Sequence, residues 1–302
     1  MNSITRKLLL SILTVVLTVV ALGTTTFAWF TLTNTAVVQP FQAEITSDTG
    51  IEVALGIPVS GEEDELNWVT TLTTAVIEDY IEDVYGAFTF THVTTANAVD
   101  FFTLGTASLT GTTGGYLSIP LNFRSNSANR ILWSTVSLTS GDAPWQADVA
   151  FTGAKGATYI AGDSATINAA DSFRIAILGT VGGLSNVVGY ENGDSLTNVV
   201  LDGDGLEMDL SNGGIGDNGA MNYFFAKNAL LPFDADAVTV LDTIQTLADN
   251  PVADLAASTT SGAAYYGQIV IRIWLEGWDA NAYNSILGRM ITSSFVFTGT
   301  SI

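Results

Sequence analysis

YLSIPLNFR, residues 116–124, alternates cleanly between apolar and polar side chains. The apolar residues share one face of an extended chain, and they are Leu117, Ile119, Leu121 and Phe123. A period of two predicts a β-strand with one buried face. Pro120 cannot donate to a strand ladder, so the same stretch is predicted to be an edge strand or a bulged strand.

Similar runs of period two recur along the chain, separated by Gly, Asn, Asp and Ser. They lie at residues 41–45, 51–55, 131–138, 173–178, 268–275 and 291–298. The abundant threonine suits a pleated, half-buried surface. These runs predict an all-β fold, a jelly-roll-like antiparallel β-sandwich, built by residues 29–302 as a single domain.

Two segments have helical periodicity instead, and they are predicted to be helical insertions in the sandwich. Residues 66–84 place apolar side chains on one face and acidic ones on the other. Residues 236–249 follow an aspartate that can cap a helix, and they end before Asn250-Pro251. Residues 179–222 are rich in Gly, Asn and Asp, which predicts long loops.

The composition excludes several classes of function. Nine basic residues stand against thirty acidic ones, giving a net charge of −21. Such a cation-poor surface cannot neutralise phosphates, so nucleic acid is not an expected partner. The absence of cysteine excludes disulfides, a thiol nucleophile and thiolate metal sites. A single histidine excludes any site that needs two imidazoles.

The N-terminus is typical of an exported protein. Arg6 and Lys7 precede an uncharged apolar run over residues 8–22, and small residues at Thr26 and Ala28 suit signal cleavage. Residues 1–28 are therefore a signal peptide or a retained hydrophobic helix. In the second case, residues 8–30 are long enough to cross a bilayer and would anchor the protein to a membrane. Both alternatives predict an extracellular or cell-surface location.

The ten residues after this segment, 29–38, read WFTLTNTAVV and are apolar, uncharged and strand-forming. Left exposed, such a segment would aggregate. It is either the first strand of the domain's own sheet or a donor strand that adds to the sheet of a neighbouring subunit. The candidate subunit-interface residues are Trp29, Phe30, Leu32, Val37 and Val38.

An acidic loop is the only candidate metal site. Asp202, Asp204, Glu207 and Asp209 alternate with glycine and apolar residues, and such oxygen ligands suit Ca²⁺ in an extracellular setting. The loop lacks the full spacing of an EF-hand, so a solvated acidic turn is the alternative.

The remaining candidates for chemistry favour structural roles. His92 lies in the alternating stretch FTFTHV, with no HExxH motif around it, and is interpreted as a strand histidine. Glu276 and Asp279 are a pair of carboxylates three residues apart, after a predicted strand. A glycosidase would hold two such groups across a cleft, whereas this spacing indicates a turn. We therefore expect no enzymatic activity.

Short stretches at both ends resemble a known family. Residues 26–31 and 41–46, with 273–279, 286–288 and 295–297 near the C-terminus, are similar to the TasA/camelysin group of secreted matrix proteins. The resemblance implies a jelly-roll subunit that polymerises into extracellular fibres by donor-strand complementation. Camelysin-type members have been described as metalloproteases, and the single histidine gives that activity no support.

The expected function is therefore that of a structural subunit of an extracellular filament or surface layer, with other copies of the chain as its partner. The alternative is a membrane-anchored surface or virion coat protein that uses its N-terminal helix in the manner of a pilin. A secreted hydrolase is a distant third.

Overall fold

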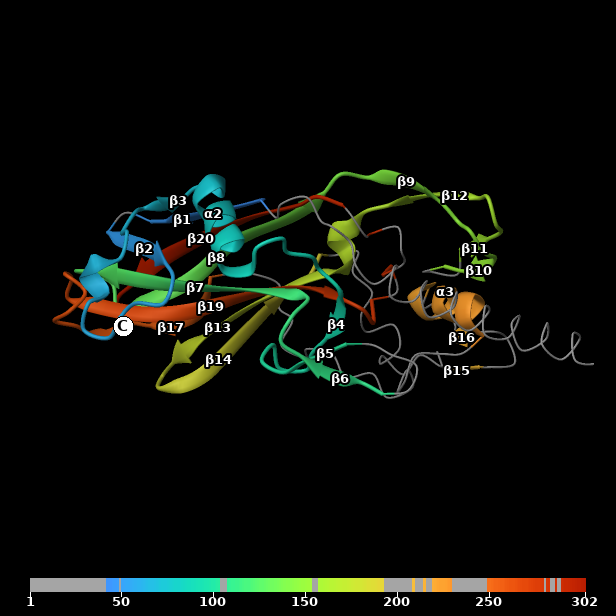
Figure 1. The fold of residues 1–302 in the computed structure, drawn as a ribbon. Helices are drawn as coiled ribbons and strands as arrows, with labels where there is room; N and C mark the ends of the chain where they lie inside the picture. The colour runs from blue at the N-terminus through green and yellow to red at the C-terminus, as the bar shows by residue number, and fades with distance from the viewer. Residues whose placement is uncertain are drawn as a thin grey trace, which may run out of the picture.

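The computed structural model describes residues 42–48, 50–103, 108–153, 157–192, 208–209, 214–215, 219–229, 249–279, 281–282, 286 and 289–302. Two large sheets pack face to face as a sandwich at one end of an elongated molecule (Figure 1). The first sheet has five strands in the order β17 (Asn250–Asp254), β8 (Arg130–Ser140), β20 (Ile291–Thr300), β1 (Gln42–Ser47) and β3 (Thr71–Leu72).

The second sheet has nine strands. Its main path runs β14 (Leu184–Tyr190), β13 (Phe173–Val181), β19 (Tyr265–Glu276), β4 (His92–Thr94), β5 (Phe101–Thr103) and β6 (Thr110–Thr112). Three further strands join it through β19, namely β7 (Tyr116–Ser125), β2 (Ile51–Leu55) and β18 (Ala256–Ala257). The predicted all-β sandwich is confirmed. Two pairs are parallel, β1 with β20 and β19 with β4, so both sheets are mixed rather than purely antiparallel.

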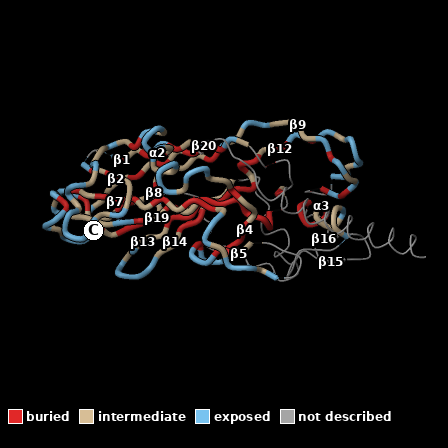
Figure 2. Tube along the Cα trace, viewed as in Figure 1, coloured by how far each residue is buried: buried red, intermediate tan, exposed pale blue. Residues whose placement is uncertain are grey.

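Strand β7 shows why the sequence alternates over residues 116–124. Its apolar residues face the other sheet and are buried, and Phe123 meets Phe297 of β20 edge-on, with 5.1 Å between the ring centroids. The strand lies between β19 and β2, but β2 covers only Leu121–Ser125. Pro120 therefore lies where β7 becomes an edge, which agrees with the edge prediction for this residue. Figure 2 shows the buried band that the sandwich encloses.

The two lateral sides of the sandwich are closed by short segments that bridge the sheets. On one side, Val69 pairs with Val53 of β2, and the chain then continues into β3 beside β1. On the other side, β17 pairs with β8 and lies across β13 and β14. Asn186 of β14 donates to the carbonyl oxygen of Pro251 in β17 at 3.0 Å. Described segments thus close both lateral sides of the sandwich, and its first described core residue is Ala43.

Helix α2 (Thr74–Tyr85) confirms the C-terminal part of the helix predicted over residues 66–84. The prediction was wrong for residues 66–73, where Val69 pairs with β2 and residues 71–72 pair with β1 instead of forming a helix. Tyr85, at the end of α2, uses its hydroxyl to bond both the N–H and the C=O of Ser118 on the open edge of β7, each at 2.9 Å. The helix predicted at residues 236–249 lies outside the described residues, apart from Asp249.

The prediction of long loops over residues 179–222 was wrong for the stretches 179–181, 184–190, 208–209, 214–215 and 219–222, which belong to strands or to a helix. Residues 184–190 form β14, because Gly182 and Gly183, both with positive φ, make a tight turn after β13. Helix α3 (Gly219–Asn228) begins inside the same range. The high glycine content indicated a turn at Gly182 and Gly183 correctly, but it did not indicate the strand β14 that follows this turn.

Smaller elements extend beyond the sandwich. Strands β9 (Ala143–Gln146) and β12 (Ser164–Ile167) form an antiparallel pair, and β10 (Phe151–Thr152) and β11 (Thr158–Tyr159) form a hairpin within the connection between them. With α3 they surround an aromatic cluster of Trp145, Phe151, Tyr159 and Tyr223. Strands β15 (Met208–Asp209) and β16 (Gly214–Ile215) have two residues each and pair with one another. Two 3₁₀ turns complete the elements, η1 (Glu63–Glu65) and η3 (Ala169–Ser172).

Candidate functional site: a buried ion-pair network

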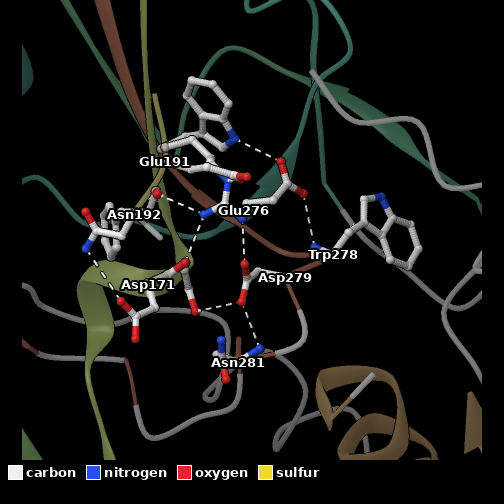
Figure 3. A network of polar contacts seen from close by, with 11 residues as sticks. Asp171, Glu191, Asn192, Glu276, Trp278, Asp279 and Asn281 are labelled. Carbon is white, nitrogen blue, oxygen red and sulfur yellow. Dashed lines mark hydrogen bonds and ion pairs between the residues drawn. The ribbon is translucent and has the colours of Figure 1, made fainter. Parts of the chain in front are cut away.

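The densest group of buried charges in the described part of the chain surrounds Arg174 of β13 (Figure 3). Arg174 is 1% exposed, Asp279 is 0% exposed and Glu276 is 1% exposed. The Nη2 atom of Arg174 lies 2.5 Å from Oδ2 of Asp279, and its Nε atom lies 2.7 Å from Oε2 of Glu191. One guanidinium therefore joins the turn after β19 to the end of β14.

Glu276, the last residue of β19, accepts hydrogen bonds at both carboxylate oxygens. Trp274 Nε1 donates to Oε2 at 3.0 Å, and the backbone N–H of Trp278 donates to Oε1 at 3.1 Å. Burial raises the pKa of Glu276 to about 7, and these hydrogen bonds together with the charge of Arg174 counteract only part of that rise.

Asp279 organises the turn in which it lies. Its Oδ1 atom accepts from the backbone N–H of Asn281 at 2.8 Å, and its carbonyl oxygen accepts from the N–H of Ala282 at 2.9 Å. Its own N–H donates to the carbonyl oxygen of Glu276 at 3.3 Å. The turn that the spacing of Glu276 and Asp279 indicates is therefore present. Each carboxylate points into the protein, where it holds backbone in place.

The network continues toward the first sheet through Asn192. Its amide Nδ2 donates to the carbonyl oxygen of Leu138 in β8 at 3.1 Å, and it also lies 3.5 Å from Oδ1 of Asp171 in η3. The carbonyl oxygen of Asp171 accepts from Nη1 of Arg174 at 3.0 Å. These hydrogen bonds and ion pairs connect both sheets to the turn after β19, which is a structural role.

Sequence reasoning identified Glu276 and Asp279 but missed Arg174, Glu191 and Asn192. The sequence did contain one indication of this ion-pair network, because Arg174 interrupts the apolar stretch of residues 173–178. A cation in a buried strand requires a carboxylate partner nearby. The identity of that partner, 105 residues further on, has no local signature.

His92 lies in β4, as predicted, next to the same turn. Its neighbour across the parallel ladder is Leu275, and Val93 pairs with Glu276. The ring nitrogen Nε2 is buried with no hydrogen-bond partner in the described part of the chain. Burial lowers the pKa of His92 to about 4. At neutral pH the imidazole is therefore uncharged.

Glu276 and His92 are expected to give opposing pH dependences of stability. The raised pKa of Glu276 favours folding below its unfolded value of about 4.5, and this contribution disappears as the pH rises through about 7. The lowered pKa of His92 favours folding above about 6.5, and this contribution disappears as the pH falls toward about 4. Between pH 5 and pH 8 each effect amounts to about 2 kcal/mol, with opposite sign.

Two substitutions separate these effects in urea unfolding at pH 5 and pH 8. His92→Gln leaves the Glu276 effect alone, so this variant becomes less stable as the pH rises. Glu276→Gln leaves the His92 effect alone, so that variant becomes less stable as the pH falls. Parallel pH profiles for the two variants would contradict both assignments.

Three of the predicted calcium ligands, Asp202, Asp204 and Glu207, lie outside the described residues. Asp209 belongs to β15, where the backbone alone is described. Among the described residues, no group of three His, Cys, Asp or Glu side chains is arranged to hold a metal ion. Calcium binding by the acidic loop stays a prediction.

The N-terminal predictions also lie outside the described residues. They comprise the signal or membrane segment of residues 1–28, the donor segment 29–38 and the interface residues Trp29, Phe30, Leu32, Val37 and Val38. Within the described part of the chain, neither helix combines the length and the hydropathy that crossing a bilayer requires.

Comparison of the chain with protein-family models, with curated proteins and with solved structures gave no match.

Proposed function

We propose that this protein is an exported structural subunit that assembles into an extracellular filament or surface layer. In this proposal residues 29–38 of one subunit add as a strand to the sheet of the next. The observation that carries it is the closure of both lateral sides of the sandwich by described segments, downstream of an apolar, uncharged, strand-forming segment.

The enclosed core supports this use of the segment. The largest inward side chains of the first sheet, Trp133, Phe295 and Phe297, are already buried against the second sheet. The bridging segments at Val69 and β17 close the two lateral sides. Described segments thus close both lateral sides, and the segment can contribute its apolar surface to another subunit.

The side-chain pattern of the segment suits strand addition. Phe30, Leu32 and Val38 fall on one face of an extended chain. Burying each such side chain stabilises a junction by roughly 1.5–3 kcal/mol. The TasA/camelysin resemblance described above leads to the same proposal.

A second candidate function is a membrane-anchored surface or coat protein. The apolar run over residues 8–30 favours it, because its length matches a bilayer-spanning helix. In that case the retained helix, and not the strand segment, would anchor or assemble the protein.

Deletion of residues 29–38 tests the proposal. We expect filaments of the intact protein in negative-stain electron microscopy and monomers of the deletion variant in sedimentation velocity, because the donor strand is lost. The matched control replaces Thr31, Thr33 and Thr35 with serine, which keeps the apolar face and should preserve the filaments. Unchanged filaments from the deletion variant would refute strand donation and favour assembly through residues 8–30.

A further inference from the structure

Strand β14 forms one edge of the nine-stranded sheet in the described part of the chain. It pairs with β13 along its whole length, from Leu184 opposite Val181 to Tyr190 opposite Ile175, and the register does not shift. Its seven residues, LSNVVGY, include no charged residue and no proline. An uncharged, regular edge strand is a template for another strand, and proteins usually block such edges.

The other edges in the described part carry protective features. Strand β17 contains Pro251, the charged Asp254 and a register shift. The open half of β7 contains Pro120, and the hydroxyl of Tyr85 occupies the backbone groups of Ser118. Strands β3 and β6 have two and three residues.

Strand β8 extends beyond β17, and this stretch is covered as well. The turn η3 packs against it, and Asn192 donates to the carbonyl oxygen of Leu138. Strand β14 is therefore the longest edge strand in the described part that lacks a charge, a proline and a bulge.

The hairpin geometry shows which backbone groups of β14 face outward. The two-glycine turn makes Val181 and Leu184 a hydrogen-bonded pair, and such pairs alternate along an antiparallel ladder. The N–H and C=O groups of Ser185, Val187 and Gly189 therefore point away from β13; Gly189 is buried, so the accessible part of the edge lies at Ser185 and Val187. The outward groups of Ser185 and Val187 can receive a short added strand.

Strand β1, which follows residues 29–38 in the chain, lies away from this edge. In the view of Figure 1, β1 and β14 lie on opposite sides of the sandwich, and β19 and β13 separate β14 from β7. Three strand spacings and one sheet spacing amount to about 17 Å. This is the approximate separation of β1 from the outer strand β14 within one subunit.

We propose that the outer edge of β14 receives residues 29–38 of a second copy of this chain. The inference rests on the proposed function and adds its acceptor site. The incoming segment and β14 are both uncharged, so strand addition requires no desolvation of a charge. Donor segment and acceptor edge are different parts of the chain, so the contact is head-to-tail and produces an open filament unless the rotation closes a ring.

Disulfide cross-linking tests this contact directly, because the chain has no cysteine of its own. Val187→Cys is mixed with each of three donor variants, Thr31→Cys, Thr33→Cys and Thr35→Cys, since the register of the added strand is open. After co-assembly and oxidation, we expect a disulfide-linked dimer from at least one mixture, because paired strands bring Cβ atoms within bonding range. The matched control uses Thr135→Cys, an exposed position on β8, and should give no dimer.

A proline substitution separates the acceptor edge from the donor segment. Val187→Pro removes an outward N–H that β13 does not use, so the urea midpoint should stay near that of the unsubstituted protein while the filament fraction falls about tenfold or more. Val188→Pro breaks the bond to Ile177 and should lower the midpoint, which verifies the assignment of the outward groups.

The outcomes separate this inference from the proposed function. Cross-links through Val187 together with loss of filaments in Val187→Pro support the inference. If deleting residues 29–38 removes filaments but Val187→Pro does not, the acceptor edge is wrong and strand donation stands. If Val187→Pro removes filaments and the deletion does not, the donor segment is wrong and strand donation by residues 29–38 is refuted.

Discussion

Replacing Arg174 with methionine is expected to lower the free energy of unfolding by about 3–5 kcal/mol. The guanidinium lies between the carboxylates of Asp279 and Glu191, and it is as deeply buried as Asp279 itself. Removing it takes away the cation that compensates their burial, and an uncompensated buried charge is far more costly than a lost surface pair. The shift in the urea midpoint, measured at pH 7, checks the expectation.

Arg130 provides the matched control for this substitution. It also pairs with an aspartate, Asp254, through two hydrogen bonds, but both side chains are 22% exposed. Arg130→Met should therefore cost far less than Arg174→Met. A loss as large as that of Arg174→Met would show that burial is not the cause of the difference.

A double substitution tests the pairing itself. Asp279→Asn keeps one oxygen that can accept the N–H of Asn281, while it removes the negative charge. Combined with Arg174→Met, it should cost less than the sum of the two single substitutions. Additive costs would mean that the two side chains stabilise the fold independently.

The contrast between β7 and Arg174 shows how far the sequence predicts this structure. The alternation in residues 116–124 reflects one face in the core, a local property, and it predicted the strand, its buried face and the edge at Pro120. The Arg174 network depends on residues that are distant in sequence, so composition and spacing could indicate the turn at Glu276 but not its cation.

Helix and strand boundaries show a related limit. Residues 69–72 fit a helical period, yet they bridge β2 and β1, because closing the sandwich buries Leu72 between sheets. The parallel pairing of β1 with β20 joins the first and last described strands, and no local pattern selects that partner. Tertiary packing decided each of these cases over local preference.

The glycine pattern carried information that composition alone conceals. Residues 179–222 look like loop because glycine is frequent, but the glycines have different roles. Gly182 and Gly183 make the turn of the β13–β14 hairpin, whereas Gly179 lies within β13, where it gives β17 room to cross. The hairpin whose outer edge we propose as the acceptor therefore depends on glycine in two ways.

Gly179→Ala is expected to destabilise the protein by about 3 kcal/mol, the upper end for overpacking. A Cβ atom at this position would lie 2.0 Å from the carbonyl oxygen of Val252 in β17, and 3.2 Å from Cγ2 of Ile269. A backbone carbonyl cannot rotate away as a flexible side chain would, so β17 must shift from β13. That shift would open the side of the sandwich that β17 closes, and urea unfolding measures its cost.

Gly111 in β6 provides the matched control, because a Cβ atom there would meet nothing within 4 Å and its φ is not positive. Gly111→Ala should therefore change stability by no more than about 0.5 kcal/mol. Amide hydrogen exchange locates the damage in Gly179→Ala, where protection should fall first in β17 and along the β13–β14 hairpin. A stable Gly179→Ala variant with unchanged exchange would mean that β17 does not cross β13 as closely as this structure places it. Because the hairpin carries the proposed acceptor edge, the loosened variant should also form filaments less readily than Gly111→Ala.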